Sequence, residues 1–121
     1  MIRFRFRAEG SEECLSALAE SLGSQGMVKR RRHSGEPLTS VNLVYWESHE
    51  QRAHAGSEAT NAVEAYITRL RRDIASIDGD LGLAWSFVLV LSEGKSTGVY
   101  LSPESIKGLG DLGAGVDVNL A

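Results

Sequence analysis

The chain has 121 residues, of which 42% are hydrophobic and 24% are charged. These values are ordinary for a folded domain and exclude a disordered, collagen-like or coiled-coil chain. The single cysteine excludes an internal disulfide framework and a cysteine-based zinc site. A net charge of −3 excludes an overall positive field that would attract nucleic acid or a membrane. We expect one domain over residues 1–121.

The first segments predict a strand followed by a helix. Residues 2–8 alternate apolar and arginine side chains, which is typical of a half-buried strand. Ser11 is placed to cap a helix, and Glu12 and Glu13 follow in the first turn, where acidic side chains suit the positive end of the helix dipole. An apolar stripe follows, and Gly23 ends the helix.

The next segments predict a hairpin and a loop. Residues 27–32 and a segment from Leu38 or Ser40 to Trp46 have strand character, and the breakers in residues 33–37 separate them. Residues 47–56 are polar and show no period, so we expect a mobile loop there.

The second half predicts a long helix, a strand pair, a short helix and a last strand. Residues 85–91 are apolar on both sides at their end, which fits a central strand. Ser102-Pro103-Glu104 is a strong helix start, with an N-cap, a proline and an acid. The full set is a helix from Ser57 or Thr60 that closes at 78–80, a strand over 85–91, a hairpin loop at 92–96, a return strand over 97–101, a helix after Ser102 and an edge strand over 116–120.

This pattern predicts an α+β fold with the element order β-α-β-β-α-β-β-α-β. We expect a single antiparallel or mixed sheet with the helices packed on one face. The alternating valines of residues 116–120 suit pairing across a dimer axis and equally suit covering by the chain itself.

The sequence contains no pattern typical of a metal site. His49 and His54 lie five residues apart, which turns them roughly 140° from each other on an ideal helix, whereas zinc-binding helices use a spacing of four. His33 is far from both in sequence. We expect no metal and no cofactor.

Catalytic motifs are also missing. Cys14 lies near a helix start, but it belongs to the apolar stripe, so we expect it to pack in the core. Gly108, Gly110 and Gly113 match G-x-G-x-x-G, yet they lie at the end of a helix where the nucleotide motif opens one. We therefore expect no catalytic residue and no enzyme activity.

Basic residues gather in the first part of the chain, where residues 1–35 hold seven positive charges against four acids. If the second strand lies beside the first, several arginines share the sheet face that the helices leave open. Solvated arginines that protect a sheet edge are one interpretation, and a face that binds phosphates or an acidic protein segment is the other. Tyr45 or Trp46 could then stack on bases. The candidate polyanion-binding residues are Arg3, Arg5, Arg7, Arg30 and Arg32.

The C-terminal part has the opposite sign, with seven acids against two lysines in residues 73–121. Some of these acids have local roles in helix starts and loops, and the others could form a patch for a basic partner. The candidate partner-binding residues are Asp78, Asp80, Glu93, Asp111 and Asp117.

Three features carry a resemblance over most of the chain. They are the strand and acid-capped helix from Phe4 to Gly23, the hairpin tryptophan Trp46, and the closing step from Tyr100 to Val118. In these features the chain resembles a large family of small bacterial α+β domains that is similar to the immunity proteins of contact-dependent growth inhibition and other polymorphic toxin systems. The resemblance implies a protein without enzyme activity that binds a cognate toxin domain and blocks it.

The sequence thus supports two hypotheses. The first is an immunity protein that neutralises a toxin domain by protein–protein contact, and the alternative is a nucleic-acid-binding module that uses an arginine-lined sheet face. The longest apolar run, residues 87–91, is far shorter than the roughly 20 residues that span a bilayer. The basic N-terminus also lacks the apolar stretch of a signal peptide. We therefore expect a cytoplasmic protein that does not contact membranes.

Overall fold

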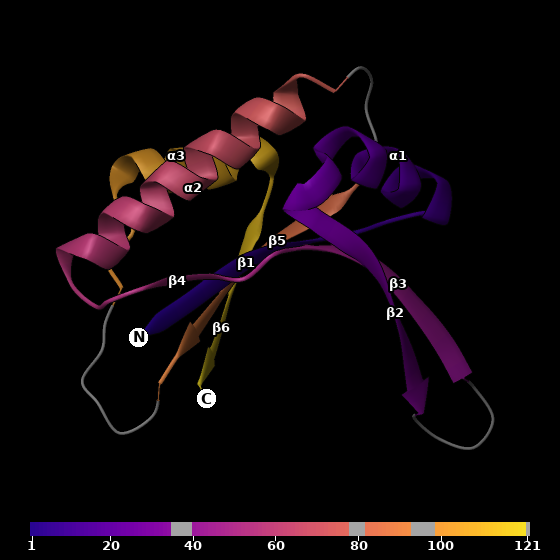
Figure 1. The fold of residues 1–121 in the computed structure, drawn as a ribbon, viewed down its shortest axis with the longest axis horizontal. Helices are drawn as coiled ribbons and strands as arrows, with labels where there is room; N and C mark the ends of the chain where they lie inside the picture. The colour runs from indigo at the N-terminus through magenta and orange to yellow at the C-terminus, as the bar shows by residue number, and fades with distance from the viewer. Residues whose placement is uncertain (35–39, 78–81, 93–98, 121) are drawn as a thin grey trace.

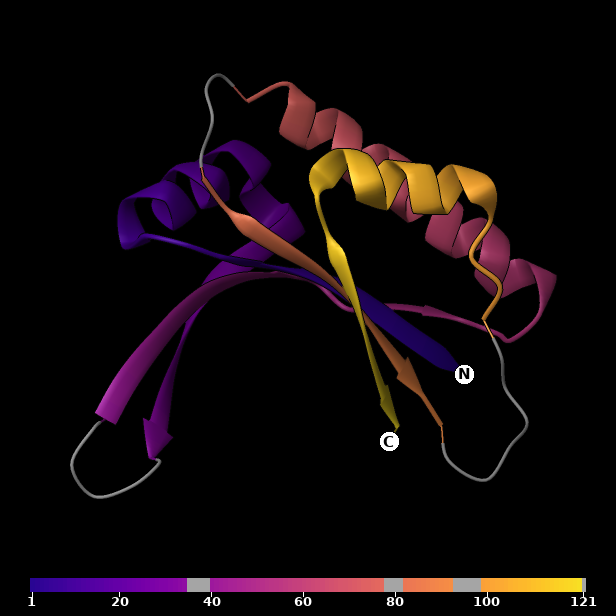
Figure 2. The same ribbon diagram turned by 180° about the vertical axis from the view of Figure 1, so that it is seen from behind.

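The computed structural model describes residues 1–34, 40–77, 82–92 and 99–120. Across these residues, six strands form one mixed sheet and three α-helices pack on one of its faces (Figure 1). The predicted α+β fold, with the helices gathered on one side of a single sheet, is confirmed. Figure 2 shows the same two layers from behind.

The first strand lies at the centre of the sheet. The strand order is β2-β3-β1-β5-β6, and β4 pairs with β1 at the end that β3 leaves free. Strands β5 and β6 are parallel, and the other pairs are antiparallel. The strands are β1 (Ile2–Glu9), β2 (Gly26–Ser34), β3 (Ser40–Ser48), β4 (Gln51–Ala53), β5 (Ala84–Leu91) and β6 (Gly115–Leu120).

Helices α1 and α3 begin and end at the residues that the sequence marks, whereas α2 ends at Ala75, before the predicted end at 78–80. Helix α1 (Glu12–Leu22) is capped by Ser11, whose hydroxyl accepts from the Cys14 amide. Helix α3 (Pro103–Leu112) starts at Ser102 in the same way, and Gly113 ends it in the left-handed conformation that glycine favours. Helix α2 (Ser57–Ala75) is the longest and follows Gly56, and the short 3₁₀ helix η1 (Gly23–Gln25) links α1 to β2.

The hydrophobic core fills the space between the helices and the sheet. Alternate residues of β1, from Ile2 to Ala8, are at most 1% exposed because they point toward the helices. Phe6 lies at the centre, with ring centroids 5.0 Å from Phe87 and 5.6 Å from Tyr66 of α2. Trp46 is fully buried in this core.

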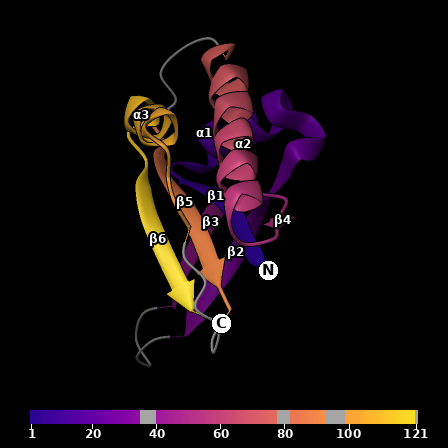
Figure 3. The ribbon, with the colours of Figure 1, turned by 90° about the vertical axis from the view of Figure 1, so that its left-hand side faces the viewer.

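The sheet is arched, with the helices on its convex side. Figure 1 shows hairpin β2–β3 and strands β5–β6 diverging from the centre of β1, away from the helix layer. In the side view of Figure 3, α2 and α3 lie next to each other. We call the opposite side of the sheet, on which no described helix lies, the helix-free face.

The predicted element order is wrong in two places. A short strand, β4, occupies part of the expected loop at residues 47–56, because this segment pairs with the first half of β1. The expected return strand over 97–101 lies partly outside the described residues, and its described part, residues 99–101, forms no strand. The third strand also separates β2 from β1, so the first two strands are not neighbours.

Candidate binding face

The helix-free face carries a row of arginines along its central strand. Arg3, Arg5 and Arg7 alternate with the buried residues of β1, so all three point away from the helices. Lys29 of β2 and Arg52 of β4 reach the same carboxylates as these arginines. We call this group, together with the carboxylates of Glu47 and Glu50, the arginine cluster.

Glu47 lies at the centre of the arginine cluster and contacts three of its cations. Its carboxylate lies 2.8 Å from Lys29 Nζ, 3.1 Å from Arg5 Nε and 3.3 Å from Arg7 Nη2, and the residue is only 8% exposed. Burial alone raises the pKa of Glu47, but the hydrogen bond from Lys29 and the charges of Arg5 and Lys29, with a further hydrogen bond from Arg7, outweigh it and hold the pKa below its ordinary value. The carboxylate is therefore ionised at neutral pH and fixes three cations.

Glu50 holds the other end of the cluster in a more exposed setting. Its carboxylate lies 3.2 Å from Arg52, 3.5 Å from Arg3 and 3.8 Å from Arg5. Arg52 lies directly opposite Arg3 in the strand ladder, so Glu50 separates two like charges that would otherwise repel. Five cations and two carboxylates thus share one face.

A β-bulge places both carboxylates on this face. Arg7 of β1 pairs with Glu47, and Phe4 of β1 pairs with Gln51. The segment from β3 to β4 therefore has one residue more between these two pairs than β1 has, which defines a β-bulge. If side chains alternated strictly from Glu47 onward, the side chain of Glu50 would point toward the helices. Because of the extra residue, it points to the helix-free face instead, where it lies near Arg5. At the bulge the Ser48 hydroxyl accepts a hydrogen bond of 2.8 Å from the Phe6 amide, which replaces a lost ladder bond.

Arg7 is further held by an aromatic ring. Its guanidinium lies 4.7 Å from the centroid of the Tyr45 ring, in the geometry of a cation–π contact. Tyr45 is only 9% exposed, so its ring supports Arg7 and offers little surface for stacking. The predicted stacking platform is therefore not an open one, and the other candidate, Trp46, is buried on the helix side.

The arginine stems lie beside an apolar strip on β5. Val88 and Val90 lie opposite Arg5 and Arg3 and are 2% and 8% exposed, although no described helix covers them. Long arginine side chains commonly cover apolar neighbours while their charged ends reach solvent. The strip thus offers the stems of Arg3 and Arg5 an apolar surface to lie against.

The structure gathers only part of the predicted polyanion site. Arg3, Arg5 and Arg7 lie together, as the alternation predicts. Arg30 does not join them, because it lies on the opposite side of β2 and pairs with Glu12 of α1. Arg32 belongs to β2 opposite Asn42, and strand β3 separates it from β1.

The predicted acidic residues do not form one patch among the described residues. Asp111 lies on α3 and pairs with Arg71 of α2 at 2.6 Å. Asp117 is exposed in β6 and lies beside Val88, on the other face of the sheet. Asp78, Asp80 and Glu93 lie outside the described residues.

Sequence reasoning missed Glu47, Glu50 and Arg52, because it assigned all three to a loop. Glu47 continues the alternation that places Tyr45 on the helix-free face, and Glu50 and Arg52 share one face beyond the bulge. Two short alternating runs separated by one extra residue are the signal that could have found them.

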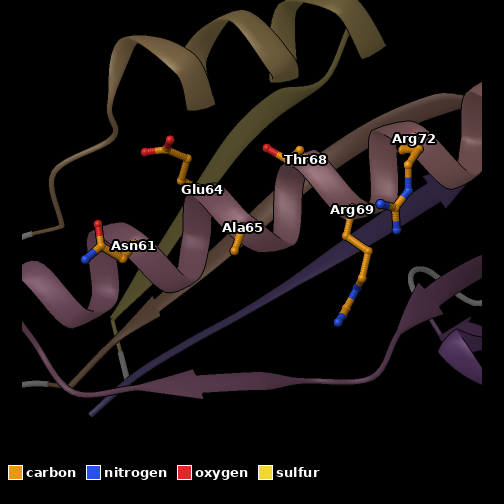
Figure 4. Close-up of a pocket in the computed structure, with 6 residues that line it drawn as sticks. All are labelled: Asn61, Glu64, Ala65, Thr68, Arg69 and Arg72. Carbon is orange, nitrogen blue, oxygen red and sulfur yellow. The ribbon is translucent and has the colours of Figure 1, made fainter.

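Several hollows border helix α2 on the helix side of the described structure, and the lining of two of them includes charged side chains. One is open and about 480 Å³ in volume, and its lining residues all belong to α2 (Figure 4): Asn61, Glu64, Ala65, Thr68, Arg69 and Arg72. The other, of about 330 Å³, lies between α2, η1 and the residues that flank and form β4. Burial raises the pKa of Tyr66 at its wall, although a hydrogen bond with Ser48 and the charge of Arg69 oppose the shift.

The second hollow contains Ser24, His49 and Asp73, residue types that occur in hydrolytic triads. In the described structure no hydrogen bond joins these three side chains, and the Asp73 carboxylate accepts from Gln25 at 3.0 Å. Among the described residues, no group of three histidine, cysteine or acidic side chains is arranged to hold a metal ion. His49 and His54 are both exposed, and Cys14 is a half-buried free thiol.

Comparison with known proteins gives no match, since no family model, curated protein or solved structure corresponds to this chain. The resemblance to immunity proteins therefore remains a hypothesis. Within the described parts of the chain, no helix has the length and apolar character that crossing a membrane requires.

Proposed function

We propose that the chain is an immunity protein that binds a cognate toxin domain through the helix-free face and neutralises it in the cytoplasm without catalysis. The observation that carries the proposal is the arginine cluster, a set of partly exposed charges on the helix-free face that ion pairs hold in place before any partner binds. The contact lies on the arginines in this proposal, because Asp111 belongs to a helix and Asp117 to the opposite face of the sheet, so the two do not form one acidic patch.

Preorganisation favours tight protein binding. Arg5 and Arg7 are held by Glu47, and Arg7 also by the Tyr45 ring, so little side-chain entropy is lost when a partner binds. Arginine is among the residue types that most often dominate binding energy in protein interfaces. The excess of cations over carboxylates suits a partner surface that carries carboxylates.

The mixed charge favours a protein over nucleic acid. A phosphate that approaches Arg5 also meets the carboxylates of Glu47 and Glu50, which lie 3.1 Å and 3.8 Å from that guanidinium. The chain as a whole is negative, and Tyr45 offers little surface for base stacking. Nucleic-acid binding is thus the second candidate, favoured only by the number of cations on the face.

The test is co-expression with the product of the gene immediately upstream, followed by co-purification, a titration of affinity and a growth assay. We expect a one-to-one complex that relieves growth arrest. Arg52→Glu reverses an exposed charge of the cluster and should weaken the complex by about tenfold or more, since charge complementarity at an interface is lost and repulsion replaces it.

The matched control is Arg72→Glu, because Arg72 has a similarly exposed side chain but lies on helix α2. An equal loss of affinity in both variants would remove the helix-free face from the proposal. Without any complex or toxicity, binding of single-stranded RNA that weakens steeply with salt would establish the second candidate in its place.

A further inference from the structure

Strand β6 is an open edge of the sheet. It pairs with β5 on one side, and no described strand lies on the other (Figure 2). All of its residues are exposed, and its apolar members, Val116, Val118 and Leu120, are 47%, 53% and 70% exposed. These side chains share one face, while Asp117 and Asn119 share the other.

The two edges of the sheet differ in their protection against pairing. The opposite edge, β2, contains four consecutive basic residues, 29–32. Lysine and arginine on an edge strand hinder the addition of another strand, because their charges are costly to desolvate and repel positive charges on an approaching strand. Strand β6 has one acid and no lysine, arginine or proline. Of the two outer strands in the described sheet order, β6 is therefore the one suited to pairing.

We propose that β6 pairs antiparallel with β6 of a second copy of this chain, about a two-fold axis at Val118. Two-fold symmetry makes such an interface self-complementary, with each strand meeting its own sequence in reverse. In this register Val116 lies opposite Leu120 of the other copy, and Val118 lies opposite itself. On the other face Asp117 lies opposite Asn119, so a carboxylate meets an amide that can donate to it.

Other registers are less favourable. A shift by one residue would place apolar side chains opposite Asp117 or Asn119 and would mix the two faces. A shift by two that centres the axis on Asp117 places this carboxylate directly opposite its own copy, and like charges in that position destabilise a strand pair. It also moves Leu120 opposite Ala114, outside the strand. The register about Val118 alone pairs all three apolar residues.

The dimer joins two sheets into one continuous sheet. Because the axis is perpendicular to the sheet, both helix layers lie on the same side, and both helix-free faces form one surface. This inference does not depend on the proposed immunity function, since the apolar edge exists whatever the arginine cluster binds.

The first test is sedimentation equilibrium of the full chain over a range of concentrations, with Val118→Lys as the variant. We expect a dimer, and we expect Val118→Lys to weaken self-association by roughly tenfold or more, because two charges then lie opposite each other at the axis. The matched control is Met27→Lys. Met27 is 52% exposed on the other edge strand, so a charge there should leave the dimer unchanged.

The second test reports the register. In a Cys14→Ser background, Val118→Cys should form a disulfide dimer under mild oxidation, because directly opposite Cβ atoms lie about 4.5–5.5 Å apart. Val116→Cys should not, since it lies opposite Leu120. A chain that stays monomeric, a dimer that Val118→Lys does not weaken, or equal cross-linking of both cysteine variants would overturn the proposal. A monomer whose β6 variants lose binding to the upstream gene product would assign this edge to that partner instead.

Discussion

Glu47 is a carboxylate that the fold removes from solvent and surrounds with three cations. An ion pair buried in this way adds little stability compared with apolar residues of the same volume, because both charges lose their hydration. Removal of the carboxylate is nevertheless costly, since Arg5 and Arg7 then remain half-buried, and the nearest remaining carboxylate in the described structure, that of Glu50, lies 3.8 Å from Arg5 only. The residue therefore acts mainly by fixing the positions of its neighbours.

The lowered pKa of Glu47 links the stability of the fold to pH. Because the folded pKa lies below the unfolded value of about 4.3, this group contributes stability above that value, and the contribution is lost as the pH falls through the folded pKa. We expect Glu47→Gln to lower the free energy of unfolding at neutral pH by about 1–3 kcal/mol and to reduce its loss in acid. Urea titrations at neutral and acidic pH measure both effects.

Glu50→Gln is the control for this prediction. Its carboxylate is 26% exposed, and its partners Arg3 and Arg52 are 38% and 63% exposed. Ion pairs in such solvated positions contribute less than about 1 kcal/mol. If Glu50→Gln costs as much as Glu47→Gln, burial is not the reason for the importance of Glu47.

At the scale of single residues, the sequence predicts the arginines better than their partners. The alternation in β1 is local, so it places Arg3, Arg5 and Arg7 on one face without knowledge of the fold. Their counter-charges lie 40 or more residues away in sequence, and no local pattern connects them. The same limit applies to Arg30, whose partner Glu12 lies on a helix that packs against β2 only in the folded chain.

At the scale of elements, the bulge between β3 and β4 is the feature that builds the site. Its one extra residue interrupts the alternation of inward and outward side chains that is typical of a strand. For this reason residues 47–56 resemble a loop in sequence. Helix starts were easier to predict, because a cap such as Ser11 or Ser102 acts within four residues of itself.

Ser48 stabilises the bulge by accepting from the buried Phe6 amide. We expect Ser48→Ala to lower the free energy of unfolding by about 1–3 kcal/mol, because the buried Phe6 amide loses the hydroxyl that accepts its hydrogen bond. The Phe6 amide should also exchange its hydrogen faster. Ser16→Ala, at an exposed position of α1, should change stability by less than about 0.5 kcal/mol. Unchanged exchange at Phe6 would contradict this role of Ser48.

Two glycines of α3 test the packing between helices. A Cβ at Gly108 would lie 2.8 Å from Ile67 Cγ2, whereas nothing lies within 4 Å of one at Gly110. Both substitutions to alanine gain helix propensity of up to about 1 kcal/mol. We therefore expect Gly110→Ala to raise the thermal midpoint and Gly108→Ala to lower it, because Ile67 is buried and cannot move freely. Calorimetry of both variants checks the sign, and a rise in both would show that α3 can shift away from α2.

At the scale of the molecule, the layer arrangement was predictable and the strand order was not. A chain of strands and amphipathic helices must bury one side of each element, so one sheet with helices on one face follows from the pattern. The insertion of β3 between β1 and β2 depends on which edges meet during folding. Pairing between strands this far apart in sequence leaves no trace in local spacing.

The charge of the molecule is also unevenly distributed. The whole chain carries −3, yet the arginine cluster holds five cations against two carboxylates. Composition describes only the sum, and the sum conceals a positive face. Immobilised heparin, a polyanion without sequence, measures how much of this charge is accessible.

We expect weak retention on heparin at low ionic strength, because Glu47 and Glu50 neutralise part of the cluster. Glu50→Gln removes an exposed carboxylate and should increase retention, with a salt dependence steeper by about one released counterion, whereas Arg52→Gln should decrease it by a similar amount. Arg72→Gln removes an equally charged and exposed group from the helix side. If heparin binds the helix-free face, this variant should leave retention unchanged. If Arg72→Gln weakens retention as much as Arg52→Gln, the polyanion responds to the overall charge and the cluster is not an accessible positive surface.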